Sequence, residues 1–94
     1  MNQYEMLYLI DSSLNEEAKN AVVAKMEGVV TSMNGVVDST EQWGLKKLAY
    51  PINYKNDAYY VLMNFRAEAP VVAELVRVTG ISAEVVRQLI TKKN

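Results

Sequence analysis

The sequence predicts an α+β fold in which two helices pack against one four-stranded sheet. Four short segments are rich in aromatic and aliphatic residues, as strands are. Two longer segments repeat apolar residues at three- and four-residue spacing, as amphipathic helices do. The segments follow one another in the order strand, helix, strand, strand, helix, strand. This order, more than any single segment, predicts the fold class.

The first strand is predicted from Tyr4 to Ile10, a short and mostly apolar run. Side chains alternate between the two faces of a strand. We expect one set to enter the core, namely Tyr4, Met6, Tyr8 and Ile10. The opposite face carries Glu5, Leu7 and Leu9. Two leucines on that second face are unexpected if it meets only water.

The first helix is predicted between Ser13 and Asn34. Ser13 with Glu16 three residues later fits a capping box, which satisfies backbone N–H groups at a helix start. Asn34-Gly35 is a left-handed stop signal. The apolar stripe between these signals, which we expect in the core, comprises Leu14, Ala18, Val22, Met26, Val29, Val30 and Met33.

The two middle strands are predicted to form a long hairpin. One runs from Val36 to about Ala49 with a bend at Gly44. Because proline cannot donate to a sheet ladder, the strand is expected either to end at Pro51 or to run on as an edge strand. Residues 53–57 are predicted to form a polar turn. The next strand runs from Ala58 to Phe65. One of its faces carries Tyr59, Val61, Met63 and Phe65; the other carries Tyr60, Leu62 and Asn64.

The second helix is predicted to begin at Pro70, because proline suits the first helical turn, and to end at Gly80. Its predicted apolar side comprises Val72, Leu75, Val76 and Thr79. Residue 81 and residues 84–91 are predicted as the last strand, which ends before Lys92-Lys93.

This element order is that of the ferredoxin-like fold, with a four-stranded antiparallel sheet and both helices on one face. We expect residues 1–94 to form a single domain of this kind. Each helix has one apolar stripe, so the second sheet face has no helix to cover it. Open sheet faces with apolar side chains usually meet a partner. The residues predicted for a protein partner on this face are Leu7, Leu9, Tyr60 and Leu62.

Composition excludes several classes of function. The chain has no cysteine and no histidine. This argues against a disulfide scaffold, the usual zinc sites and His-based catalysis. The acidic residues are scattered, and no glycine-rich phosphate loop is present. We therefore expect no enzyme, no metal, no cofactor and no small-molecule substrate. No signal peptide or membrane span is predicted, so we expect a cytoplasmic protein without membrane contact.

The net charge is only −1, but local clusters of basic and aromatic residues favour RNA binding. Lysine and arginine make the phosphate contacts that dominate non-specific affinity, and tyrosines stack on bases. The residues predicted to contact RNA are Tyr4, Lys46, Lys47, Tyr50, Lys55, Arg87, Lys92 and Lys93. The alternative is that lysines only keep an edge strand soluble. Tyr8 and Tyr59 are expected in the core.

The stretch Trp43 to Ile52, with sequence WGLKKLAYPI, resembles the bacterial small-subunit ribosomal protein S-six family. Tyr4-Glu5, Tyr59-Tyr60-Val61 and Val85-Val86-Arg87 match the same family, and the resemblance covers essentially the whole chain. It implies a structural protein of the small ribosomal subunit. It also implies binding to the central domain of small-subunit ribosomal RNA, with ribosomal protein S-eighteen as a direct partner.

Carried over by position, the family's basic pair falls on Lys46 and Lys47, and the basic residue of its last strand falls on Arg87. Family members commonly have arginine at one or both positions of the pair, whereas lysine lacks the bidentate fork. Ala58 stands where the family often has glycine. The sequence also leaves two alternative functions open. One is a ferredoxin-like protein-interaction or oligomerisation module without RNA binding. The other is a small-molecule binder or enzyme, which the missing His and Cys disfavour.

Overall fold

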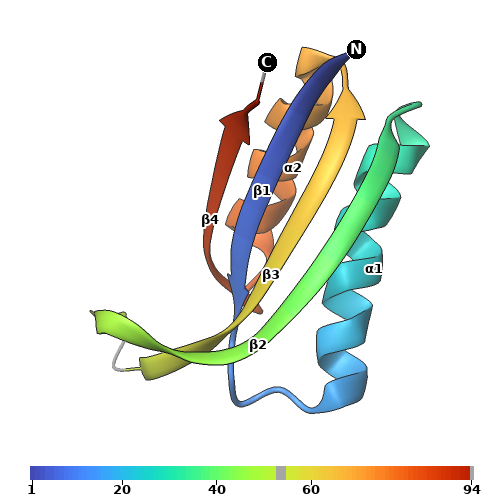
Figure 1. Ribbon diagram of the computed structural model, residues 1–94. Coiled ribbons are helices and arrows are strands. Elements are labelled where there is room, and N and C mark those ends of the chain that lie inside the picture. The colour runs from blue at the N-terminus through green and yellow to red at the C-terminus, as the bar shows by residue number, and fades with distance from the viewer. Residues whose placement is uncertain (53–54, 94) are drawn as a thin grey trace.

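The computed structural model describes residues 1–52 and 55–93, apart from the side chains of Ile52 and Lys55. Its elements follow the predicted order: β1 (Asn2–Ile10), α1 (Glu16–Ser32), β2 (Val36–Ile52), β3 (Lys55–Ala67), α2 (Ala69–Ile81) and β4 (Val85–Lys92). The strands form one sheet in the order β2-β3-β1-β4, and every neighbouring pair is antiparallel. Both helices lie behind the sheet in Figure 1. The predicted ferredoxin-like fold is confirmed.

β1 lies in the middle of the sheet and sets the core. Met6 faces Met63 of β3, and on the other side of β1 it faces Ile90 of β4. Because alternate residues share a face, the predicted set Tyr4, Met6, Tyr8 and Ile10 all points toward the helices and is buried. The helices meet this set with their own apolar stripes, comprising Val22, Val23, Met26 and Val30 of α1 and Val71, Leu75 and Val78 of α2.

The start of α1 differs from the prediction. The Asp11 carboxylate accepts hydrogen bonds from the Ser13 backbone N–H at 2.9 Å and from the Ser13 hydroxyl at 2.8 Å. Ser13 therefore belongs to a turn before the helix, and the predicted Ser13–Glu16 capping box is wrong. Asn15 caps instead, because its side-chain oxygen accepts the Ala18 N–H at 2.8 Å.

The end of α1 is as predicted. Asn34 adopts a left-handed conformation with φ of 66°, and the Gly35 N–H donates to the Val30 carbonyl at 2.9 Å. A Cβ on Gly35 would lie 2.7 Å from Val30 Cγ1 and 3.1 Å from the Arg66 carbonyl oxygen. Glycine is needed here because the chain turns tightly between α1 and the sheet.

α2 begins with Pro70 in its first turn, as predicted. Its buried residues are Val71, Leu75, Val78 and Thr79. Val76, predicted on the buried side, is 46% exposed, because the buried stripe follows positions 71, 75 and 78. Gly80 does not end the helix; the helix runs to Ile81, and Ser82 caps it.

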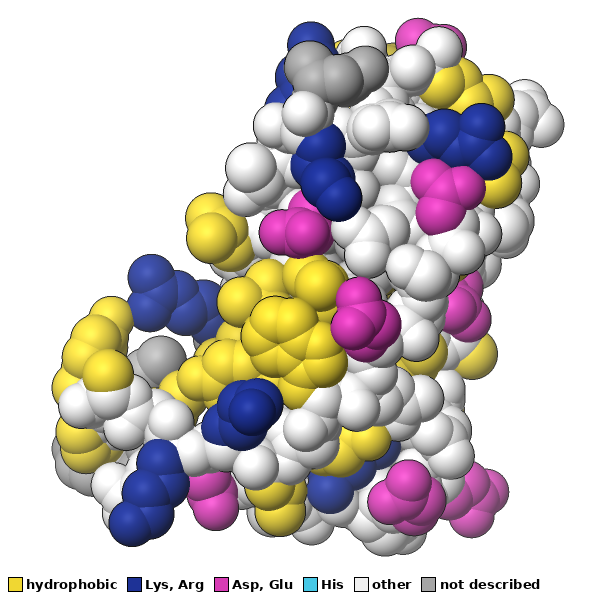
Figure 2. Space-filling view, viewed as in Figure 1, with side chains coloured by type: hydrophobic (Ala, Val, Ile, Leu, Met, Phe, Trp, Pro, Cys, Tyr) yellow, Lys and Arg dark blue, Asp and Glu magenta, His cyan; other side chains and the backbone are white. Residues whose placement is uncertain are grey.

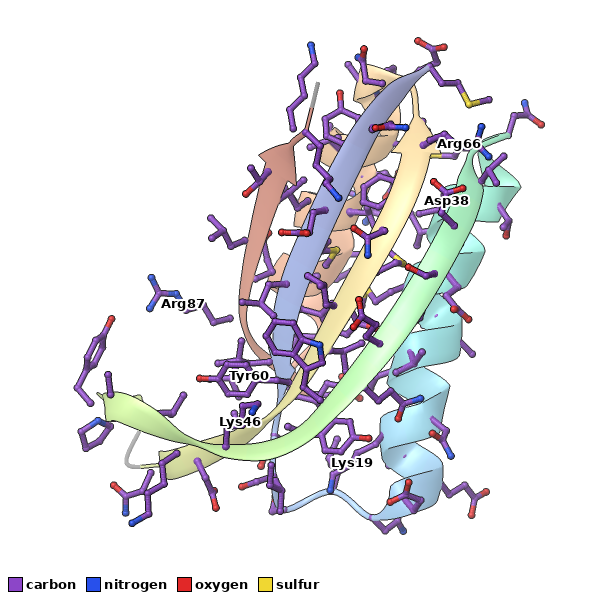
Figure 3. The ribbon with its side chains drawn as sticks, in the orientation of Figure 1. Lys19, Asp38, Lys46, Tyr60, Arg66 and Arg87 are labelled. Atoms are coloured by element: carbon purple, nitrogen blue, oxygen red, sulfur yellow. The ribbon has the colours of Figure 1, made fainter. Side chains whose placement is uncertain are left out.

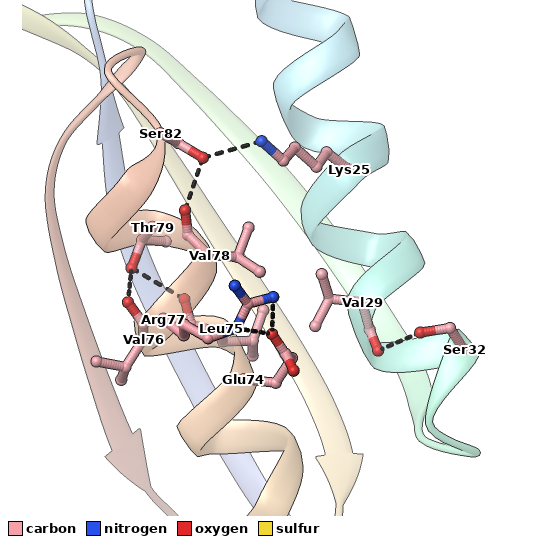
Figure 4. A network of polar contacts seen from close by, with 10 residues as sticks. All are labelled: Lys25, Val29, Ser32, Glu74, Leu75, Val76, Arg77, Val78, Thr79 and Ser82. Carbon is pink, nitrogen blue, oxygen red and sulfur yellow. Dashed lines mark hydrogen bonds and ion pairs between the residues drawn. The ribbon is translucent and has the colours of Figure 1, made fainter.

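One polar network joins the two helices (Figure 4). The Lys25 ammonium of α1 donates to the Ser82 hydroxyl at 3.0 Å, and this hydroxyl donates to the Val78 carbonyl at 2.7 Å. The last turn of α2 thus gains a partner for one of the carbonyls that helix ends leave unpaired.

The hairpin strands are longer than predicted. β2 continues through Pro51 to Ile52, and β3 already begins at Lys55, so most of the predicted polar turn at residues 53–57 is strand. Residues 53 and 54 of that turn lie outside the described residues. Of the two outcomes expected at Pro51, the strand runs on, and proline is tolerated because β2 is an edge strand. The bend predicted at Gly44 is present, with φ of +88°.

Tyr8 is the largest of the fully buried side chains. Among the described residues its hydroxyl has no hydrogen-bond partner. Burial, and secondarily the negative charge of Glu27, raises the pKa of Tyr8 well above its ordinary value. Glu27 itself accepts a hydrogen bond from Thr40 of β2 at 2.6 Å. Tyr8 therefore acts as a neutral core residue at any physiological pH.

The tight turn after α1 gives a stability prediction. Gly35→Ala should lower the free energy of unfolding by about 1–3 kcal/mol, since the added methyl group overlaps Val30 and has backbone behind it. Gly28→Ala is the matched control: no atom lies within 4 Å of a Cβ there, and alanine favours the helix by about 0.5–1 kcal/mol. Urea unfolding followed by circular dichroism measures both. Equal effects of the two substitutions would contradict the described turn.

Candidate RNA and protein interface

The sheet face opposite the helices, here called the open face, is ordered in rows of cross-strand neighbours. One row runs Leu62, Leu7, Leu89 across β3, β1 and β4. The next row runs Tyr60, Leu9, Arg87 across the same strands. Side chains in such rows touch one another. The four apolar residues predicted for a protein partner, two on β1 and two on β3, therefore lie beside Arg87 of β4.

The other end of the open face is polar and internally paired. Arg66 of β3 holds Asp38 of β2 through its Nε at 3.1 Å and its Nη2 at 3.0 Å. The Asn64 amide donates to the Ser39 hydroxyl at 3.1 Å and accepts from Lys93 at 3.4 Å. Figure 3 shows Asp38 and Arg66 at this upper end. Its polar groups have partners within the protein.

The apolar end is more shielded than the sequence predicted. Leu9 is only 6% exposed and Leu62 only 9%, although both were expected to be open; Leu7 and Tyr60 are half-buried. Two causes act together. Row neighbours cover each other, and the far part of the hairpin bends across this end of the sheet (Figure 1).

The bend encloses an apolar pocket between the hairpin and β4. It is lined by Leu7, Leu9, Leu48, Ala49, Tyr50, Tyr60, Arg87, Gln88 and Leu89. Arg87 closes one side of the pocket, since its Nη1 donates to the Tyr50 hydroxyl at 2.9 Å. This bond joins residues 37 positions apart. The structure thus places two predicted RNA contacts, Arg87 and Tyr50, beside the predicted protein contacts.

Cations flank the apolar end. Figure 2 shows apolar side chains gathered over the lower half of the open face, with lysine or arginine on both sides. Figure 3 identifies Lys46 on the hairpin and Arg87 on β4, with Tyr60 between them. Lys46 is opposite Ala58 and Lys47 opposite Asp57, and both lysines are exposed. A surface of this kind can take apolar side chains at its centre and phosphates at its margins.

The remaining predicted cations lie elsewhere. Lys92 pairs with Tyr4 at the end of β4 near the chain termini, far from the hairpin (Figure 1). Lys93 is 3.9 Å from the Glu5 carboxylate. The backbone of Lys55 pairs with Ile52, but its side chain is outside the described residues. The predicted RNA set therefore divides between two ends of the sheet.

Among the described residues, no group of three acidic side chains could hold a metal ion. No helix in the described part of the chain is long and apolar enough to cross a membrane.

A family model described as Ribosomal protein S6 matches residues 3–92. The chain belongs to this family. It is 43% identical to "Small ribosomal subunit protein bS6" of Clostridium novyi, over 96% of this chain and 95% of that protein. The protein of the same name from Clostridium perfringens (strain SM101) is 42% identical over 99% of this chain and 98% of its own length.

The fold matches as well. The crystal structure of 30S ribosomal protein S6 from Thermotoga maritima superposes with a TM-score of 0.93, at 24% identity, over 98% of this chain and 87% of that one. Members of the S6 family are structural proteins of the cytoplasmic ribosome. The match therefore confirms the family predicted from the sequence, and it confirms the prediction that the protein is not an enzyme.

One predicted RNA contact of this S6-family chain is wrong. Tyr4 is 7% exposed, and its ring stacks on Phe65 with centroids 5.5 Å apart and 26° between planes. A ring already packed on a core residue offers no face to a base. The same alternation that placed Tyr4 in the core set should have removed it from the RNA set.

Sequence reasoning also missed Leu89 and Leu48. Leu89 is 62% exposed and lies on the same face as Arg87, two residues earlier in β4. Since Arg87 was assigned to a binding face, alternation alone would have added Leu89. Leu48 had no comparable signal, because the register of β2 against β3 shifts between Lys47 and Ile52.

Leu62 and Leu89 lie in the same cross-strand row, but they should contribute differently to the stability of the fold. Leu62→Ala should lower the free energy of unfolding by about 2–4 kcal/mol, because Leu62 is nearly as buried as a core residue. Leu89→Ala, the same substitution in the same row, should change it by less than about 0.5 kcal/mol, because Leu89 is exposed. Chemical denaturation of the free protein measures both. A large loss of stability in Leu89→Ala would show that the pocket is closed in the free protein.

Proposed function

We propose that this chain assembles into the small ribosomal subunit as one domain spanning residues 1–94. There it binds the central domain of small-subunit ribosomal RNA together with ribosomal protein S-eighteen. The single observation that carries the proposal is the composition of the lower open face: an exposed apolar patch with cations at its margins, on a member of the ribosomal protein S6 family.

The apolar patch is the proposed protein contact. Leu89 is 62% and Tyr50 59% exposed, and both line the pocket of the open face. Large exposed apolar side chains that gather on one face mark interaction sites. No helix of the described chain covers this side of the sheet (Figure 1). A partner protein that buries these side chains gains hydrophobic free energy without disturbing the core.

The cations at the margins are the proposed RNA contacts. Lys46 and Lys47 are exposed on the hairpin, and neither takes part in a hydrogen bond or ion pair among the described residues. Arg87 keeps guanidinium donors beyond the one that meets Tyr50. Each lysine or arginine that meets a phosphate releases counterions, which supplies most of the salt-dependent affinity.

Joint binding explains how a chain of net charge −1 holds to RNA. Few phosphate contacts give modest affinity, especially at physiological salt. A partner bound to both the apolar patch and the RNA makes the second contact intramolecular, which raises its effective concentration to the millimolar range. We therefore infer that the partner protein and the RNA strengthen each other's binding.

A double substitution tests the RNA contact. Lys46→Ala with Lys47→Ala should weaken binding to a central-domain RNA transcript in the presence of S-eighteen. It should also reduce the slope of log affinity against log salt by about 1.4–1.8, because two phosphate contacts are lost. The matched control is Lys25→Ala with Arg77→Ala, which removes the same charge from the helices. Filter binding across a salt series measures the slope, and an unchanged slope in the hairpin variant would contradict the site.

Co-sedimentation with small ribosomal subunits at moderate salt tests the function itself. The proposal expects the wild-type chain in the pelleted subunits. A chain that stays in the supernatant and forms a stable homodimer without RNA affinity would favour the interaction-module alternative, which the exposed apolar patch also fits.

A further inference from the structure

The hairpin has two parts separated by a bend. Up to Gln42, β2 follows the sheet. The register then shifts between Gln42 and Gly44, leaving Trp43 as an extra residue, and Gly44 takes a φ of +88°. A bulge of this kind bends the strand and increases its twist. The part beyond the bend, residues 45–52 and 55–58, is here called the distal hairpin; it sweeps toward β4 (Figure 1).

The distal hairpin carries the groups that the proposed function uses. Lys46, Lys47 and Tyr50 all lie beyond the bend. Arg87 does not, because it lies on β4. The spacing of the two sets of contacts therefore depends on the direction in which the distal hairpin leaves the sheet.

A chain of three side chains lies on the helix side of this bend. The Lys19 ammonium of α1 sits over the ring of Tyr59 of β3, 4.8 Å from the ring centroid. The Tyr59 hydroxyl donates to the Gln42 side-chain oxygen at 2.7 Å. Gln42 is the last residue of β2 before the register shifts. The contacts thus run from α1 through β3 to the base of the bend.

Lys19 is unusual among the described lysine and arginine residues because it is only 8% exposed. Most of the Lys19 residue is covered by its neighbours, whereas a lysine at a freely replaceable surface position usually extends into water. Lys19 instead uses the face of an aromatic ring as its partner (Figure 3). A second contact, Thr40 to Glu27 of α1 at 2.6 Å, holds β2 two residues earlier.

We propose that Lys19 and Tyr59 are positioning residues for RNA and partner binding, although neither lies on the open face. They hold the base of the bend against α1, which fixes the direction of the distal hairpin and places Lys46 and Tyr50 relative to Arg87. This inference rests on the proposed function for its binding consequence, but its structural part stands without it.

The expected effect follows from populations. If the distal hairpin samples several directions, only a fraction of molecules presents all contacts at once, and the apparent affinity falls by that fraction. Loss of the Lys19 contact should weaken binding of the central-domain transcript with S-eighteen about 3- to 10-fold. The salt slope should stay unchanged, because Lys46 and Lys47 are retained and the number of phosphate contacts is the same.

Three substitutions test this. Lys19→Met keeps the length of the side chain and removes the charge. Lys19→Arg restores a cation that stacks on aromatic rings and should recover binding. Lys25→Met makes the same change on the same helix, at a residue that contacts Ser82 and not the hairpin, and should leave binding unchanged. Tyr59→Phe keeps the ring but removes the bond to Gln42, and should weaken binding like Lys19→Met.

A second measurement does not depend on binding. Residual dipolar couplings of the free protein report the direction of the distal hairpin relative to β1. They should be reduced for residues 45–48 in Lys19→Met and Tyr59→Phe, and unchanged in Lys25→Met. Couplings in Lys19→Met equal to those of the wild type would overturn the inference, as would wild-type affinity in that variant. If the wild type itself fails to bind RNA with S-eighteen, the proposed function fails, while the couplings still decide the positioning role.

Discussion

Two helices on one face of a four-stranded sheet leave the other face without cover, and this constraint shapes the rest of the molecule. The helix side is closed by β1, whose alternate residues enter the core between α1 and α2. The same alternation forces Leu7 and Leu9 to the open face. The open face must then satisfy its side chains by pairing them, by covering them with its own chain, or by binding another molecule.

The protein uses all three solutions at different places. At the upper end, Arg66 with Asp38 and Asn64 with Ser39 pair across strands. At the lower end, the bent hairpin covers Leu9 and closes on β4 through the bond between Arg87 and Tyr50. What remains exposed is Leu89 with the hairpin residue Tyr50, and these two side chains are what a partner would cover. The hairpin thus both shields the sheet and carries the groups offered to RNA.

Sequence patterns predicted the parts of this structure that depend on local periodicity. The core face of β1, the α1 stripe apart from Met33, which is 37% exposed, the stop at Asn34-Gly35 and the bend at Gly44 all follow from the chemistry of neighbouring residues. The errors arise where a contact distant in sequence, or a competing local one, decides the outcome. Asp11 accepts a hydrogen bond from Ser13, so Ser13 is not the helix cap, and Asn15 caps the helix instead. The exposure of Leu9 and Leu62 depends on the direction in which the hairpin bends. Residues 7 and 48 are far apart in sequence, and the bend brings both into one pocket.

The central claim is that the exposed apolar end of the open face is the surface that a partner covers in the small subunit. Hydroxyl-radical footprinting of side chains, on the free protein and on its complex with central-domain RNA and ribosomal protein S-eighteen, tests it most directly. The account predicts that oxidation of Leu89 and Tyr50 falls strongly in the complex, while Ile81 at the end of α2, which is 70% exposed, stays equally reactive. Protection of Ile81 with unchanged oxidation of Leu89 and Tyr50 would contradict it.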